Sequence, residues 1–124
     1  MEIEEQVPSC EVCQSIARKE LKLKTALVWV TWGIEPKPYV VSRTEYENND
    51  DMIYVCDAPT ETEMKQAILA KDYSQYVWLK CSPISTGYSY ALEYEDAYSV
   101  IQLATGEATT APNALAIIFE AVIE

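Results

Sequence analysis

The chain has 124 residues, and its 20 Asp or Glu against 9 Lys or Arg give a formal net charge of -11. Such a charge repels nucleic acid and anionic lipid, so we expect no direct nucleic-acid binding and no membrane association. Histidine is absent, which removes the commonest general base and transition-metal ligand, and we therefore expect no enzyme activity. With 49% hydrophobic residues, the composition is that of one folded domain over residues 1–124, not of a disordered acidic tail.

The first third of the chain is predicted to hold one helix and two strands. Residues 1–9 form an acidic lead that we expect to be flexible. Ser9 is a suitable cap for a helix over residues 10–24, because apolar side chains recur there at helical spacing. The β-branched and aromatic segment at 26–32 predicts a central strand, and a turn with two prolines leads to a second strand at 39–42.

The middle third is predicted to contain a strand, a helix and a strand in succession. The polar run at 45–51 indicates an exposed loop, and residues 52–56 then predict a strand. Thr60 and Glu63 have the spacing of a capping box, which predicts the start of a short helix. A further strand at 76–81 completes a βαβ-like unit, although the order of the elements does not by itself establish a parallel pairing.

The last third is predicted to form a hairpin followed by a helix or a strand. Large apolar side chains alternate with smaller or polar ones at 88–94, which is typical of a half-buried antiparallel strand. A turn then leads to a sixth strand at 98–104 and a loop at 106–111. At 113–124 a nearby threonine and proline favour a helix, whereas alternating apolar residues also fit a strand, and we favour the helix.

Together these elements predict an α+β or α/β fold in a single compact domain. They amount to a mixed sheet of about five to six strands, an N-terminal helix, a short central helix and a C-terminal helix. The sequence has no apolar run of the roughly 20 residues that a membrane span requires, and its first residues are acidic, unlike a secretory signal. We therefore expect a cytoplasmic location, which for a virus-encoded chain means the host cytosol or the virion.

Cys10 and Cys13 form a Cys-x-x-Cys pair, the only short motif of the sequence with chemical content. Such a pair at a helix start fits a redox dithiol, whose first thiol the helix dipole would acidify. It also fits half of a structural zinc or iron site, with Cys56 and Cys81 as the other ligands if the strands that they end are neighbours. A third interpretation, which we favour, is that all four are free or disulfide-linked cysteines in apolar positions.

Charge is segregated along the chain. Six of the nine basic residues lie between positions 18 and 43, and none follows Lys80. The candidate partner-binding residues are the acids of the polar loop and the acids and tyrosines of the predicted hairpin. The tyrosines also fit the inner face of a sheet. The set comprises Glu45, Glu47, Asp50, Asp51, Tyr88, Tyr90, Glu93, Tyr94, Glu95 and Asp96.

Three classes of function fit these features. The first is an inhibitor or immunity-type protein whose carboxylates stand in for phosphates and mask a basic, nucleic-acid-binding surface of its target. The second is a small structural or assembly subunit of a larger particle, capsid-associated or complex-bound, in which the basic segment of one copy docks on the acidic face of another. The third is an adaptor stabilised by zinc or iron at the four cysteines. We expect the first, with a basic protein as partner, or further copies of the chain.

Overall fold

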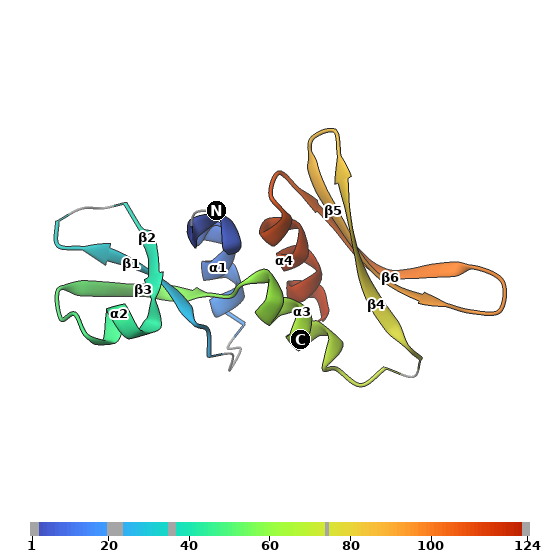
Figure 1. Ribbon diagram of the computed structural model, residues 1–124, viewed down its shortest axis with the longest axis horizontal. Coiled ribbons are helices and arrows are strands. Elements are labelled where there is room, and N and C mark those ends of the chain that lie inside the picture. The colour runs from blue at the N-terminus through green and yellow to red at the C-terminus, as the bar shows by residue number, and fades with distance from the viewer. Residues whose placement is uncertain (1–2, 20–23, 35–36, 74, 123–124) are drawn as a thin grey trace. The chain divides into compact units, whose positions relative to one another are not determined.

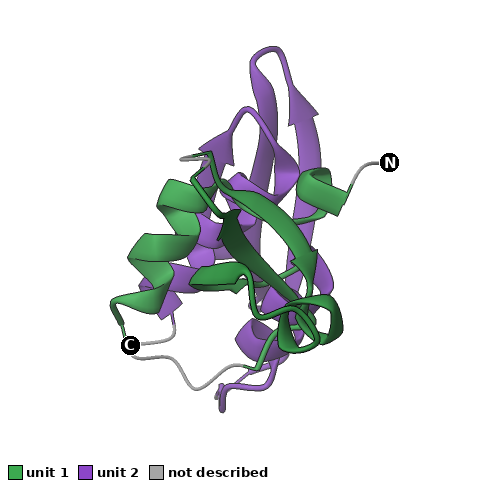
Figure 2. Cartoon of the chain, turned by 90° about the vertical axis from the view of Figure 1, so that its left-hand side faces the viewer, with its two compact units in different colours: residues 1–60 green, residues 61–124 purple. Residues whose placement is uncertain are grey.

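The chain divides into two compact units, residues 1–60 and 61–124, which Figures 1 and 2 show. Each unit combines a three-stranded antiparallel sheet with helices, so the α+β class is confirmed. The expectation of one mixed sheet is wrong, because the strands form two separate sheets. No described helix is long and apolar enough to span a membrane. The structure is a computed structural model that describes residues 3–19, 24–34, 37–73 and 75–122.

The first unit is built on a sheet of strand order β2-β1-β3 in which both pairings are antiparallel. Its central strand is the one predicted to be central, and the first four side chains of that strand are all buried. In chain order the elements are η1 (Ile3–Gln6), α1 (Cys10–Ala17), β1 (Leu27–Trp32), β2 (Tyr39–Ser42), α2 (Arg43–Glu47) and β3 (Met52–Ala58).

Both faces of this sheet are covered, which explains why β1 is apolar without alternation. On one face, Trp29 of β1 packs with Cys13 of α1 and Cys56 of β3. On the other face, Val28 belongs to a cluster with Met52, and α2 lies beside it. The cysteines of α1 and β3 therefore belong to a packed core rather than to a surface loop.

The second unit has a sheet of strand order β4-β5-β6, again antiparallel throughout. Both of its helices lie along one side of this sheet, as Figure 1 shows. The chain's last described segment is a helix, as we favoured. In chain order the elements are α3 (Glu61–Leu69), β4 (Val77–Ile84), β5 (Gly87–Glu95), β6 (Val100–Ala108) and α4 (Ala111–Val122).

The close approach of α4 to the sheet depends on Gly106 in β6. A Cβ atom at this position would lie 2.4 Å from the Ala114 carbonyl oxygen and 2.8 Å from the Ile117 Cβ. Leu115 and Phe119 of α4 are consequently buried, and each contributes about 1.5–3 kcal/mol of apolar burial. Only glycine permits this contact between a strand and a helix backbone.

Two expectations for the first unit need correction. The helix predicted over 10–24 ends at Ala17, because Arg18 and Lys19 form a turn, and residues 20–23 lie outside the described part. The loop predicted at 45–51 begins inside α2, which starts where the Ser42 hydroxyl accepts a hydrogen bond from the Glu45 N–H. The flexibility expected of residues 1–9 is a separate point and stays a prediction; within this lead, residues 3–6 form η1, and the next residue is buried in the core.

The βαβ-like unit is also wrong as a pairing of neighbouring parallel strands. β3 pairs antiparallel with β1, and β4 pairs antiparallel with β5 in the other sheet. The helix between them, α3, packs on α4 within the second unit. Each strand thus pairs with a partner from its own unit, and the intervening helix makes no parallel crossover.

Candidate functional site

Three of the four cysteines lie together in the core of the first unit. Cys10 and Cys13 are one turn apart on α1, and both pack against the cluster that contains Cys56 of β3. The Cys10 thiol forms a side-chain hydrogen bond with the Cys56 thiol, and Cys13 donates to the Pro8 carbonyl oxygen at 3.4 Å. All of these cysteines are free. The cluster is therefore a contact between one helix and one strand of the first unit.

The fourth cysteine belongs to the second unit. Cys81 is exposed on β4, where it pairs with Tyr90 of β5. Among the described residues, no group of three or more His, Cys, Asp or Glu side chains is arranged to hold a metal ion. The four-thiolate site stays a prediction, and metal analysis of freshly reduced protein tests it. Near-stoichiometric zinc or iron is the outcome that this site requires, and less than about 0.2 equivalents per chain would contradict it.

Burial makes the clustered thiols weak acids. It raises the pKa of Cys13 and of Cys56 to about 12, and for Cys13 this outweighs the neighbouring Trp29 indole, which favours the thiolate. Burial also raises the pKa of Cys10, although its hydrogen bond with Cys56 acts in the opposite direction. A redox dithiol needs an acidified first thiol. The pKa of Cys10 is instead raised, because desolvation is the largest of the effects on this thiol.

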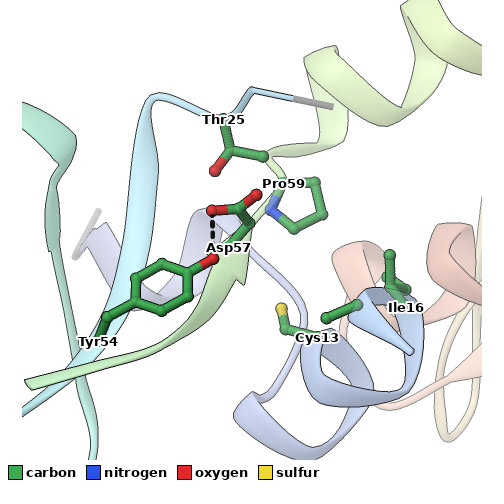
Figure 3. Close-up of a pocket in the computed structure, with 7 residues that line it drawn as sticks. Cys13, Ile16, Thr25, Tyr54, Asp57 and Pro59 are labelled. Carbon is green, nitrogen blue, oxygen red and sulfur yellow. Dashed lines mark hydrogen bonds between the residues drawn. The ribbon is translucent and has the colours of Figure 1, made fainter. Parts of the chain in front are cut away.

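A small pocket of about 180 Å³ lies beside this cluster, and Figure 3 shows its lining residues. Its polar wall is internally satisfied. Asp57 accepts a hydrogen bond from the Tyr54 hydroxyl at 2.7 Å and pairs with the Arg43 guanidinium at 2.8 Å. Arg43 Nε also donates to the Thr25 carbonyl oxygen at 2.7 Å. These contacts tie β3, the start of α2 and the segment that leads into β1 together, which is a structural role.

The candidate acids of the first unit are all at the surface. Glu45 and Glu47 lie on α2, and Asp50 and Asp51 lie in the turn that follows. All four are exposed. Among the described residues, none of them forms an ion pair, so their charge is not compensated by a neighbouring cation. We call these four residues the α2 patch.

The candidate residues of the second unit are divided between buried and exposed positions. Tyr90 is only 2% exposed and points toward α3. Its hydroxyl donates to Glu61 at 2.6 Å, and its ring centroid lies 5.5 Å from the Lys65 ammonium. Glu93 is 7% exposed. Tyr94 is half-buried, and Tyr88, Glu95 and Asp96 are exposed. The inner-face alternative therefore applies to Tyr90.

Asp96 has a local role in the turn between β5 and β6. Its carboxylate accepts hydrogen bonds from the backbone N–H groups of Tyr98 and Ser99, each at 2.9 Å. These two bonds favour the ionised form and lower the pKa of the Asp96 carboxyl. The tip of the hairpin is thus held in one conformation and keeps its negative charge.

The strand register of the second unit shows where Glu93 points. In an antiparallel sheet, directly opposite residues share a face, and Trp78, Glu93 and Gln102 form one such row across the three strands. The Trp78 indole N–H donates to Glu93 Oε1 at 3.1 Å, and the Gln102 amide donates to Oε2 at 3.3 Å. We call this side the open face. It carries Trp78 and Lys80 of β4, Glu93 and Glu95 of β5, and Val100 and Gln102 of β6.

The opposite side of the same sheet is the covered one. Tyr90 contacts α3, and Gly106 faces α4. The described helices of the unit both lie on that side, as Figure 1 shows. Sequence reasoning named Glu93 but missed Trp78 and Gln102, because only the register between β4, β5 and β6 places the three side chains in one row.

Burial raises the pKa of the Cys13 and Cys56 thiols, and Asp57 is ion-paired with Arg43. Comparison of the chain with protein-family models, curated proteins and solved structures finds no match. The surface of the chain itself offers two features for binding, the exposed carboxylates and the open face.

Proposed function

We propose that this protein is a non-catalytic acidic interaction module of the inhibitor or immunity type. It masks a basic, nucleic-acid-binding surface of a partner protein. The observation that supports this proposal is the α2 patch, whose four carboxylates are exposed and without ion pairs among the described residues. Glu95 and Asp96 at the tip of the β5–β6 hairpin add two exposed carboxylates to the second unit.

The α2 patch has the physical properties that phosphate mimicry requires. Its carboxylates stand on a short helix and a turn, and the helix is held by the Ser42 cap, so the charges have defined positions. Arg43, the basic residue that precedes the patch in the sequence, is ion-paired with Asp57 and does not neutralise the carboxylates of the patch. Uncompensated charge of this kind steers a basic partner and raises the association rate, an effect that salt suppresses.

The test is recovery of a partner by the tagged full chain at low and at high salt. The partner should be a basic protein, should elute as salt rises, and should lose its ability to bind nucleic acid when this chain is added. A variant with Glu45→Gln, Glu47→Gln, Asp50→Asn and Asp51→Asn should release that inhibition by about tenfold or more.

A matched variant removes the same charge elsewhere. Glu4→Gln, Glu5→Gln, Glu11→Gln and Asp72→Asn change four other exposed acids and should leave the inhibition within about twofold. If the two variants lose inhibition equally, net charge alone is responsible. If neither variant loses inhibition, the α2 patch is not the binding surface.

The alternative function, a structural or assembly subunit, has its own supporting observation. Ile34, in the turn after β1, is 100% exposed, and Tyr98, in the β5–β6 turn, is 97% exposed. Large apolar side chains at turn tips suit contacts between subunits. Sedimentation of the protein from its native source separates the two proposals, because a subunit sediments with a large particle and an inhibitor with one partner.

A further inference from the structure

Glu93 is a buried carboxylate on the open face, and it lacks a cation. It is 7% exposed, and both of its oxygens accept hydrogen bonds from neutral donors, the Trp78 indole and the Gln102 amide. No basic side chain of the described residues is within ion-pair distance of it. An unpaired charge that has lost most of its water is costly, so a cation brought to this position is favoured.

A pair of aromatic rings lies at this carboxylate, and one of the two, Trp78, is hydrogen-bonded to it. The rings of Tyr76 and Trp78 have centroids 6.3 Å apart and an interplanar angle of 33°. Tyr76 is 84% exposed, which is unusual for a large aromatic side chain, and Trp78 is half-buried. A cation over the face of an indole or phenol ring is attracted by the ring's quadrupole. The aromatic pair and the carboxylate therefore favour the same kind of ligand.

We propose that the open face docks an arginine side chain of a basic protein partner, with the guanidinium stacked on Trp78 and paired with Glu93. The proposal rests on the proposed function in one respect, namely that the partner is basic. It goes further in naming the side chain that the second unit recognises and the residues that recognise it. Charge complementarity selects this occupant, because a carboxylate without an ion pair among the described residues lies beside an aromatic pair.

Arginine suits the geometry better than lysine. Its guanidinium is planar, stacks on aromatic rings and offers several N–H donors to one carboxylate, whereas an ammonium is a compact and strongly hydrated charge. The bond from Gln102 is the longer of the two that Glu93 accepts, 3.3 Å, and the Gln102 side chain is exposed. An arriving guanidinium can displace this amide and replace a neutral hydrogen bond with a charge-assisted one.

Lys80 is the cation of the open face itself, two residues from Trp78 along β4. It is exposed and belongs to the next row of the sheet, opposite Ala91. Its charge repels an incoming guanidinium. Lys80→Gln should therefore strengthen arginine binding about two- to threefold, which distinguishes this surface from one that merely needs exposed aromatic rings.

The experiment titrates the full chain with a nine-residue peptide in which three arginines are separated by glycine and serine. Binding is followed by two-dimensional NMR, in which the indole N–H resonance of Trp78 reports on the row. The same peptide with citrulline in place of arginine is a neutral isostere and should cause no saturable shift. The same peptide with lysine should bind several-fold more weakly.

Variants locate the binding. Glu93→Gln should weaken it about tenfold, and so should Trp78→Leu, for which the backbone N–H resonance of Glu93 replaces the lost indole signal; Tyr76→Ser should weaken it about threefold. The matched control is Glu107→Gln, which removes the same charge from the same side of the sheet. Glu107 lies opposite Ser89, two rows from Trp78, and its variant should change affinity less than twofold. Because Tyr76 and Lys80 are exposed, their variants keep the test valid if Trp78→Leu fails to fold.

Equal losses for Glu93→Gln and Glu107→Gln, or no shift of Trp78 at millimolar peptide, would overturn the inference. The proposed function would survive that result if the native partner still depended on the α2 patch. Conversely, arginine binding at Trp78 with no partner that depends on the α2 patch would leave this inference standing and remove the proposed function.

Discussion

Each cysteine of the chain has a different solvent environment. Cys81 is exposed on β4, Cys10 is half-buried at the start of α1, and Cys13 and Cys56 are buried. A thiol reagent attacks the thiolate, so both burial and a raised pKa slow the reaction. Titration of the reduced protein with a chromogenic disulfide at pH 8 should show one fast thiol, one slower thiol and two that react only after unfolding. Cys81→Ser should remove the fast phase, whereas two or more equally fast thiols would contradict the cluster.

The same burial makes stability depend on alkaline pH. The pKa of Cys13 and of Cys56 is about 12 in the folded chain, against an ordinary value of 9.0, so the folded state retains protons that the unfolded state loses. Stability is therefore complete below about pH 9 and falls as the pH rises toward 12, with an upper limit of about 1.4 kcal/mol per pH unit for each thiol.

Urea unfolding between pH 7.5 and 10.5 under reducing conditions measures this slope. Cys13→Ala with Cys56→Ala should reduce it, and the remaining slope near pH 9 should come from Cys10, whose pKa burial also raises. Tyr54, whose pKa is raised to about 12 by burial and by its bond to Asp57, should leave a smaller residual slope above pH 10. A double variant with the full wild-type slope would show that other groups dominate.

At the scale of elements, the local sequence pattern was sufficient to predict several helices and strands. The central strand β1 was predicted from its β-branched and aromatic residues, the half-buried strand β5 from its alternation, and the C-terminal helix α4 from a nearby threonine and proline, and all three elements form. The pairing of β3 with β4 failed because strand order does not specify partners. α1 was predicted too long because its apolar spacing continues past Ala17, where the backbone turns.

The packing of α4 on the sheet gives a prediction at the same scale. Gly106→Ala places a Cβ 2.4 Å from the Ala114 carbonyl oxygen, so α4 or β6 must shift, and we expect a loss of about 1–3 kcal/mol in unfolding free energy. Gly33→Ala is the control: it has a φ of +54° but no atom within 4 Å of the added Cβ, and should cost about 1 kcal/mol. A smaller loss at Gly106 than at Gly33 would contradict the close approach.

At the scale of the whole molecule, sequence could specify the charge but not its geometry. The acids of the α2 patch were predicted as exposed and are exposed. Glu93 was also named as a candidate partner-binding acid for its charge, yet the register of three strands makes it a buried acceptor beside Trp78. The sequence near Glu93 gives no signal of this row, because its partners Gln102 and Trp78 are nine and 15 positions away in the chain.

Both units carry excess negative charge, since residues 1–60 contain 11 acids and 6 bases and residues 61–124 contain 9 acids and 3 bases. Like charges held in a compact fold repel one another, and salt screens that repulsion. Raising sodium chloride from 20 to 300 mM should therefore increase the unfolding free energy in urea by about 1 kcal/mol.

The same salt series should weaken binding to a basic partner, because there the screened interaction is attractive. Opposite signs in one buffer series tie both effects to the charge of the folded surface. Stability that fell with salt would instead mean that internal ion pairs such as Arg43 with Asp57 outweigh the repulsion. In that case the uncompensated carboxylates of the α2 patch would carry too little field to steer a partner, and the proposed function would lose its physical basis.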